Sequence, residues 1–224
     1  MAKLEFKPGT MLNPVPAVMV SCGEGNEKNI ITIAWTGIIN SDPPMTYISV
    51  RKERYSYDII RKTGEFVINL TTRKLAYATD YCGVRSGRDV DKFREQNLTP
   101  DSSRVVKCPS IKESPVSIEC RVKEIKELGS HDMFIADIVS VSADENLMDE
   151  DGRLRLDRAG LIAYNHGHYY ELREHEIGRF GYSVMKPRTK KKLAAQKNKR
   201  THGSNNRGRK RLLGKYSIGK EDAP

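Results

Sequence analysis

The chain has 224 residues, of which 38% are hydrophobic and 30% are charged, and its formal net charge is +10. This length suits one domain with or without an extension. No apolar run approaches the ~20 residues of a membrane-spanning helix, and Met1–Thr10 lacks the apolar centre of a secretory signal peptide. We therefore expect a cytoplasmic protein without a transmembrane segment.

The positive charge is concentrated in the C-terminal part of the sequence. Lys186–Pro224 contains 14 Lys/Arg and two acids, a net of +12, whereas Met1–Met185 contains 25 Lys/Arg and 27 acids, a net of −2. A segment so rich in like charge buries too little apolar surface to offset the entropy of ordering it. We therefore predict one folded domain over residues 1–185 and a basic, disordered tail over residues 186–224.

Four sequence runs in the first 70 residues are predicted to be strands. Val15–Cys22 and Ile30–Ile39 flank a turn rich in Gly and Asn, which is typical of a hairpin. After a second turn, NSDPP, Met45–Arg51 is predicted as a third strand, and Phe66–Leu70 is a compact apolar strand.

Three short helices are predicted between and after these strands. Tyr55–Lys62 is the first, with Ser56 as a candidate N-cap and Gly64 as the residue that breaks it. Arg73–Tyr81 and Asp91–Gln96 follow, joined by the loop CGVRSGRDV.

The rest of the domain is again rich in strands. Val116–Glu127 and Asp132–Val141 are predicted as two long strands, Asp149–Gly152 as a turn, and Ala163–Glu171 as a last strand. Many strands with short helical insertions indicate a mainly β fold, an antiparallel β-barrel with short helices, and not alternating βαβ units.

Several familiar binding motifs are absent from the sequence. It contains no GxGxxG after a strand, no GxxxxGK[ST] and no HExxH. The cysteines form no CxxC pair and are predicted to be reduced thiols; they are Cys22, Cys82, Cys108 and Cys120. His166 and His168 would share one face of the last strand, but the sequence offers no third ligand beside them, so no metal site is predicted.

Two segments combine positive charge, hydroxyl donors and turn backbone, which are the groups that bind a phosphate. In SVRKERYSY, strand alternation places Ser49 and Arg51 on the face that Tyr47 also occupies, and Arg54 and Ser56 arrive at a helix start.

The second segment is the loop CGVRSGRDVDK, where Ser86, Arg88 and Lys92 supply donors and glycines permit close approach. Either segment alone is also typical of an ordinary exposed turn. Trp35, the single tryptophan, lies near Asn29 and Thr32 and would either face a planar ring or pack in the core.

The order of these motifs is more specific than any one of them. The series TxAW, SDPP, ISVR, SY and GEFVINL, followed by DYCGVRSGRDVDKF, resembles the flavin reductase-like family with the FMN-binding split barrel, particularly its flavoredoxin branch. The similarity covers roughly Phe6–Arg173. It implies a six-stranded barrel that forms a homodimer and holds FMN non-covalently near the subunit interface.

The resemblance assigns cofactor contacts residue by residue. The strand that passes the isoalloxazine ring supplies Asn29, Thr32, Ala34 and Trp35. The phosphate-side segment supplies Ser49, Arg51 and Ser56. The loop that closes over the ribityl phosphate or the ring edge supplies Cys82, Gly83, Ser86 and Lys92. His131 and Tyr164 match positions near the flavin, in the same subunit or in its partner.

We therefore expect an FMN-dependent oxidoreductase that moves electrons from NAD(P)H or a redox partner to a partner protein or a small-molecule acceptor. Lys92 and His131 are candidates to stabilise negative charge on reduced FMN. The alternatives are an FMN carrier without its own turnover and an enzyme like pyridoxamine-phosphate oxidase, which fits the motifs less well. The basic tail is expected either to bind nucleic acid or another polyanion, or to act as a solubilising extension.

Overall fold

The computed structural model describes residues 2–172 and 176–189 of the chain. The chain divides into two compact units, Met1–Glu174 and His175–Pro224. In the second unit, the described residues contain a 3-10 turn, Tyr182–Val184, and residues 187–189 are helical. The predicted basic tail lies outside the described residues from Lys190 onward.

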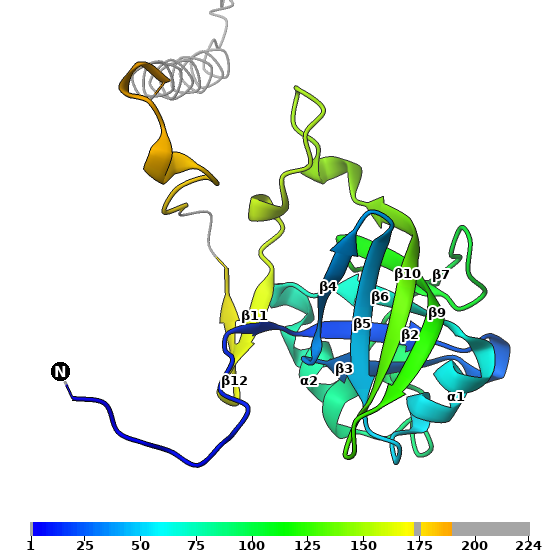
Figure 1. Ribbon diagram of the computed structural model, residues 1–224. Helices are drawn as coiled ribbons and strands as arrows, with labels where there is room; N and C mark the ends of the chain where they lie inside the picture. The colour runs from blue at the N-terminus through cyan, green and yellow to red at the C-terminus, as the bar shows by residue number, and fades with distance from the viewer. Residues whose placement is uncertain (1, 173–175, 190–224) are drawn as a thin grey trace, which may run out of the picture. The chain divides into compact units, whose positions relative to one another are not determined.

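A seven-stranded antiparallel sheet forms the body of the first unit, with its strands in the order β3-β2-β6-β9-β10-β5-β4 (Figure 1). The strands are β2 (Val18–Cys22), β3 (Asn29–Ile33), β4 (Thr36–Ser41), β5 (Pro44–Val50), β6 (Glu65–Leu70), β9 (Val116–Glu127) and β10 (Asp132–Ala143). A three-stranded sheet pairs β1 (Val15–Pro16), β11 (Ile162–Asn165) and β12 (His168–Glu171). A two-stranded sheet pairs β7 (Pro100–Asp101) and β8 (Ser110–Ile111).

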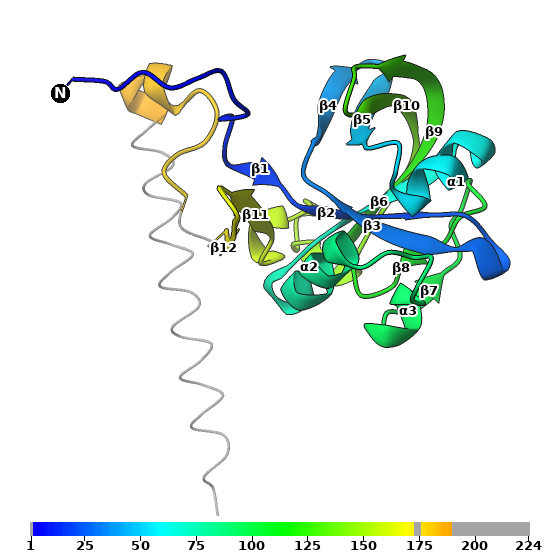
Figure 2. The same ribbon diagram turned by 90° about the horizontal axis from the view of Figure 1, so that it is seen from below.

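Three short α-helices accompany the sheets (Figure 2), namely α1 (Tyr55–Thr63), α2 (Ala76–Val84) and α3 (Lys92–Glu95). Single 3-10 turns occur at Gly25–Glu27, Arg73–Leu75, Glu145–Leu147 and Leu156–Arg158. The predicted mainly β architecture with short helices is confirmed. In the part of the chain that the structure describes, no helix has the length and apolar character that crossing a bilayer requires.

A kink at Ala34–Trp35 closes the large sheet into a barrel. The prediction of one strand over Ile30–Ile39 is wrong, because β3 ends at Ile33 and β4 begins at Thr36. β3 and β4 form the two opposite edges of the sheet, yet only two residues join them, so the sheet must curl until its edges meet. If β3 and β4 are counted as one kinked strand, the barrel has six strands, as the resemblance implies.

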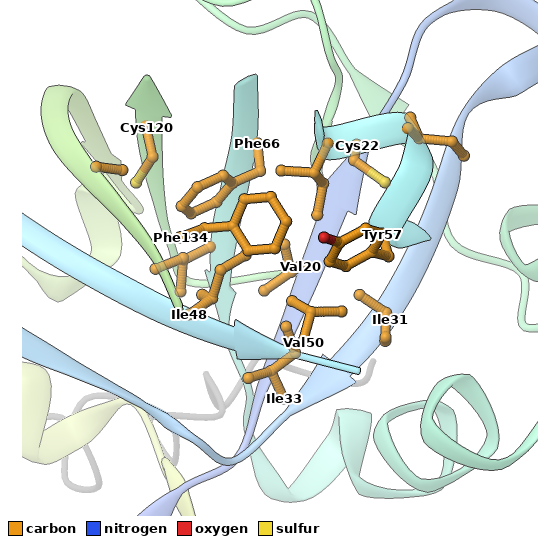
Figure 3. Close-up of a cluster of buried hydrophobic side chains, with 14 of the residues drawn as sticks. Val20, Cys22, Ile31, Ile33, Ile48, Val50, Tyr57, Phe66, Cys120 and Phe134 are labelled. Atoms are coloured by element: carbon orange, nitrogen blue, oxygen red, sulfur yellow. The ribbon is translucent and has the colours of Figure 1, made fainter. Parts of the chain in front are cut away.

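The barrel interior is packed with side chains from alternate strand positions, as the period of two requires. Figure 3 shows Phe66, Phe134 and Ile48 at its centre, and all three are fully buried. Tyr57 enters from α1 and meets the Phe134 ring edge-on, with ring centroids 5.4 Å apart. Its hydroxyl donates to the buried Asp132 carboxylate over 2.6 Å.

The start of α1 differs from the prediction. Arg54 occupies the N-cap position, and Ser56 lies inside the first turn, so the prediction of Ser56 as N-cap is wrong. The Ser56 side chain is buried and accepts a hydrogen bond from Asn29 Nδ2 over 2.8 Å. Gly64 ends α1 as predicted, with a left-handed φ of +68° that glycine adopts without strain.

The prediction of a single last strand over Ala163–Glu171 is also wrong. β11 and β12 form a hairpin, and its turn contains His166 (φ 51°) and Gly167 (φ 86°). His166 therefore belongs to the turn and does not share a strand face with His168. The hairpin pairs Tyr164 with Tyr169 across the two strands.

Candidate functional site

The first unit contains a cleft with two adjoining parts. The aromatic cavity, of about 350 Å³, is lined by residues that include Trp35, His131, Tyr164 and Tyr169. The basic cavity, of about 310 Å³, is lined by residues that include Arg85, Arg88, Ser86 and Lys92. Ile31, Arg51 and Arg54 line both cavities, so the two parts lie side by side.

The turn between β5 and α1 places cations at the junction of the two cavities. Arg54 Nη1 donates to the Gly83 carbonyl over 3.3 Å, and Arg88 Nη1 donates to the Glu53 carbonyl over 3.2 Å. The Arg88 guanidinium also lies 5.5 Å from the centre of the Tyr55 ring. These contacts hold the arginines beside the first turn of α1, where N–H groups without intrahelical partners favour an anion.

Gly87 allows the loop after α2 to approach the strand β3 closely. A Cβ at this position would lie 2.3 Å from Asn29 Oδ1 and 2.7 Å from Tyr55 Cδ1. Both neighbours line the basic cavity, and Asn29 is itself held by its bond to Ser56. The wall of the cavity at this point is therefore backbone, which suits a ligand that accepts hydrogen bonds from N–H groups.

Lys92 lies at the buried side of the basic cavity. The sequence suggested a loop donor, but the residue is the first of α3 and its side chain is buried. Nζ donates to the carbonyls of Ile30, over 2.7 Å, and Cys82, over 2.8 Å. An ammonium has three donors, so one remains for a ligand. Burial lowers the pKa of Lys92 to about 8.

Two aromatic rings form one wall of the aromatic cavity. Trp35 lies at the kink between β3 and β4 and is 44% exposed, so the alternative that it packs in the core is wrong. Its ring is parallel to that of His131, with centroids 6.3 Å apart. Burial, and next the charge of Arg51, lower the pKa of His131 below its ordinary value. The lowered pKa favours the neutral imidazole at pH 7 in the ligand-free protein.

The β11–β12 hairpin and α2 contribute a second group of lining residues. The rings of Tyr164 and Tyr169 meet at 63° with centroids 5.6 Å apart. The Tyr169 hydroxyl donates to Asp80 Oδ1 over 3.1 Å, which ties β12 to α2. Gly83 faces Thr32 without a side chain, and the Thr32 hydroxyl donates to the carbonyl of Thr79.

The structure brings all thirteen predicted site residues to the two cavities. Those that line the aromatic cavity are Thr32, Ala34, Trp35, Ser49, Arg51, Gly83, His131 and Tyr164. Those that line the basic cavity are Asn29, Arg51, Ser56, Cys82, Ser86 and Lys92.

Sequence reasoning missed several lining residues, among them Asp80, Arg85, Gly87 and Tyr169. Arg85 and Gly87 stand in the segment CGVRSGRDV, whose glycines and arginines were an available signal. Asp80 is the first residue of the motif DYCGVRSGRDVDKF but was not assigned a contact. Tyr169 had no signal, because one tyrosine in a strand is an ordinary residue.

The fold is a closed antiparallel barrel, and its basic cavity lies beside an aromatic one. Proteins of this class can hold a planar ligand with an anionic end. Residues 11–173 match the family model of the flavin reductase like domain. The chain therefore belongs to the flavin reductase-like family, and the resemblance seen in the ordered motifs is confirmed.

Similar proteins agree with this assignment. Flavoredoxin of Desulfovibrio vulgaris (Miyazaki F) superposes with a TM-score of 0.75 at 30% identity, covering 81% of this chain and all of that one. Flavoredoxin from Methanosarcina acetivorans superposes with a TM-score of 0.74 at 23% identity, covering 83% of this chain and all of that one. A protein of Pyrococcus abyssi is 30% identical over 135 residues, 60% of this chain and 77% of its own. The predicted split-barrel fold is confirmed.

Proposed function

We propose that the protein binds FMN and transfers electrons through it. The observation that carries this proposal is the junction of the two cavities at Arg51 and Arg54. FMN has a planar ring system at one end and a phosphate at the other, and the cleft offers aromatic walls and fixed positive charge in the same order. The flavoredoxin of Desulfovibrio vulgaris, at 30% identity, supports the same ligand class.

The residues of the basic cavity suit a phosphate by their chemistry. Arg51, Arg54 and Arg88 would bind its oxygens by charge-assisted hydrogen bonds, Lys92 would add its third donor, and the backbone at Gly87 leaves room for close approach. The N–H groups of the first turn of α1 would add their dipole. Together these groups would fix the anionic end and so orient the ring.

The residues of the aromatic cavity would cover the ring and limit access of water. Trp35 and His131 would pack on one side, while Tyr164 lies on the β11–β12 hairpin. Bound FMN supplies the hydride and electron chemistry, and the protein supplies orientation and electrostatics. Because the lowered pKa of His131 favours the neutral imidazole, its contribution near the ring would be a hydrogen bond and not a full charge.

We propose NAD(P)H as the electron donor, or a redox protein in its place, and a partner protein or small molecule as the acceptor. The absorbance spectrum of the purified protein, followed by anaerobic titration with NADH and then NADPH, tests cofactor and donor together. A protein that takes up no FMN would overturn the proposal. FMN uptake without NAD(P)H oxidation or electron relay would identify the alternative, an FMN carrier.

Paired variants test separately whether the basic cavity binds the phosphate and the aromatic cavity binds the ring. Riboflavin has the same ring as FMN but no phosphate. Arg54→Gln should weaken FMN binding about tenfold and leave riboflavin binding unchanged, because only the phosphate contact is lost. Trp35→Ala should weaken both ligands equally. Arg61→Gln, an exposed arginine on α1 that lines neither cavity, is the matched control. Equal loss of FMN and riboflavin in Arg54→Gln would contradict the assignment of the two ends.

We also propose that the protein works as a homodimer in the cytoplasm. Ile38 and Ile39 on the edge strand β4 and Val141 on β10 are exposed apolar side chains, which a partner subunit would cover. All four cysteines are buried and free, which suits a reducing compartment. Light scattering coupled to gel filtration tests the dimer, and Ile38→Asp should shift it to monomer. A wild-type protein that elutes as a monomer at all concentrations would exclude this proposal.

A further inference from the structure

A buried carboxylate lies next to the turn that carries arginines into the cleft. Asp132 is the first residue of β10 and is fully buried. Its backbone pairs with Val50, the last residue of β5, and the turn to α1 begins directly after that residue. Asp132 lines neither cavity, so contact with a ligand in the cleft does not explain this buried charge.

The Asp132 carboxylate holds the turn at two points, one on each side of Arg54. Its Oδ2 accepts a hydrogen bond from the Tyr57 hydroxyl over 2.6 Å and lies 3.5 Å from Lys52 Nζ. Lys52 precedes Arg54 in the turn, whereas Tyr57 follows it in the first turn of α1. The hydrogen bond to Asp132 raises the pKa of Tyr57, so the phenol keeps its proton and remains a donor at neutral pH.

The second oxygen of Asp132 shows that the carboxylate is not there for stability alone. Oδ1 is buried and has no hydrogen-bond partner among the described residues. A buried acceptor without a partner lowers stability, and an apolar side chain of similar volume often stabilises a fold as well as a buried charge does. The carboxylate is therefore better explained by the geometry that it imposes on the turn.

The main chain at Asp132 has support that the turn lacks. Backbone pairing with β5 and β9 fixes this residue whatever its side chain, and with it the preceding residue, His131. Lys52 lies beyond the last paired residue of β5, and its other ion pair, with Glu127 over 3.4 Å, is exposed and therefore weak. Loss of the Asp132 charge should thus affect the turn and leave the aromatic cavity in place.

We propose that Asp132 is a positioning residue that directs Arg54 toward the phosphate end of the cleft. It acts through Lys52 and Tyr57, which hold the chain on both sides of this arginine. The inference rests on the proposed function, since it concerns the group that would bind the FMN phosphate. A charge-assisted hydrogen bond depends on direction as well as distance, so a small rotation of the turn weakens phosphate binding.

The test measures the affinities of FMN and riboflavin for the full-length, flavin-free protein by fluorescence quenching. Asp132→Asn keeps an oxygen that accepts from Tyr57 and removes the attraction for Lys52. We expect FMN affinity to fall about fivefold, part of one charge-assisted hydrogen bond. Riboflavin affinity should not change, because riboflavin has no phosphate. Lys52→Met, at a half-exposed side chain that lines neither cavity, should show the same loss for FMN alone.

A double-mutant cycle distinguishes positioning from a general structural role. Arg54→Gln already removes the contact that Asp132 is proposed to direct, so adding Asp132→Asn to it should lower FMN affinity by less than twofold. A substitution that only loosened the fold would weaken FMN and riboflavin together and would add to Arg54→Gln. Asp58→Asn removes an exposed carboxylate of α1 that lines neither cavity, and should leave both affinities unchanged.

The outcomes separate this inference from the proposed function. Absence of FMN uptake by the wild type, scored first, would overturn both. FMN uptake with wild-type affinity in Asp132→Asn, an equal loss of riboflavin, or full additivity with Arg54→Gln would overturn the role of Asp132 alone. If Asp132→Asn does not fold, Lys52→Met, alone and combined with Arg54→Gln, decides by the same criteria.

Discussion

A side chain at position 87 would collide with two residues that shape the basic cavity. The Cβ of Gly87→Ala would lie 2.3 Å from Asn29 Oδ1 and 2.7 Å from Tyr55 Cδ1, which forces the loop away from β3. We expect FMN affinity to fall about tenfold, a cost of ~1.4 kcal/mol, because the phosphate end of the cleft is displaced. Riboflavin affinity should change little. Fluorescence quenching of each flavin on titration with protein measures both.

Gly9→Ala is the control for this substitution, because a Cβ there meets only the carbonyl of Lys7, at 3.8 Å. If Gly87→Ala weakened riboflavin as strongly as FMN, the collision would be acting on the whole cleft and not on its phosphate end.

The charge of Lys92 should make FMN binding depend on pH. Burial lowers its pKa from 10.5 to about 8, so the free protein loses this ammonium as the pH rises from 7 to 9.5. The FMN phosphate is already a dianion above pH 7. We expect FMN affinity to fall about tenfold over this range relative to riboflavin. In Lys92→Met this additional fall should be absent, whereas Lys74→Met, an exposed lysine, should behave as wild type.

The lowered pKa of Lys92 also makes stability depend on pH, but stability should increase with pH where FMN affinity decreases. Between pH 8 and 10.5 the unfolded chain keeps the Lys92 proton while the folded, ligand-free protein releases it. The contribution of Lys92 to the free energy of unfolding therefore rises with pH in this window.

An FMN affinity that stayed constant from pH 7 to 9.5 in the wild type would show that Lys92 does not contact the phosphate.

Sequence reasoning found residues of the site but not their partners. Asn29 and Ser56 were both named from the motifs, yet their mutual hydrogen bond depends on β3 and α1 meeting in space. Ser56 was given a capping role because Ser is common at N-caps, but a buried acceptor for Asn29 outweighs that local preference. Lys92 was named as a donor to the cofactor, but its burial was not predicted, because that burial depends on the carbonyls of Ile30 and Cys82.

At the scale of elements, hydrophobic pattern predicted where most strands lie but not where they bend. The run Ile30–Ile39 is dominated by apolar and β-branched residues and has no Pro, so its pattern contains no clear break at Ala34–Trp35. The kink follows from barrel closure, which is a property of the whole sheet. In the last predicted strand, Gly167 was the available sign of a turn, and the hairpin that it permits pairs Tyr164 with Tyr169.

A buried carboxylate on β9 holds the loop that precedes β8. Glu119 accepts hydrogen bonds from the backbone N–H groups of Arg104, Val105 and Val106 at 2.6–3.0 Å. Glu119→Gln replaces one accepting oxygen by an NH₂ group that faces N–H donors. We expect the free energy of unfolding to fall by about 2–3 kcal/mol, measured by urea denaturation. Glu124→Gln, an exposed acid on the same strand, should change it by less than about 0.5 kcal/mol.

The Glu119 contribution should also be lost in acid. Burial opposes ionisation of this carboxyl, but the three N–H donors outweigh burial and lower its pKa below the ordinary 4.5. The folded protein therefore binds fewer protons than the unfolded chain below pH 4.5, and stability falls as the pH drops through that region. The acid-dependent loss should be smaller in Glu119→Gln. An identical pH dependence in both proteins would exclude Glu119 as its source.

At the scale of the whole molecule, the predicted division into a domain over residues 1–185 and a tail over residues 186–224 remains a proposal based on charge. The folded part is nearly neutral, while Lys186–Pro224 carries a net +12. The cleft is built entirely from residues between Ala17 and Tyr169. Flavin binding and polyanion binding should therefore be separable properties.

Removal of Lys186–Pro224 should abolish retention on heparin and binding to nucleic acid while FMN content stays unchanged. Basic residues bind a polyanion by releasing its counterions, so the affinity of the full-length protein should fall at least about a hundredfold between 50 and 200 mM salt, with little dependence on sequence. A full-length variant with the 14 Lys/Arg of this segment replaced by Gln keeps chain length and should behave like the truncation. Equal polyanion binding by all three proteins would place the binding surface on the folded domain, and the segment would then be a solubilising extension.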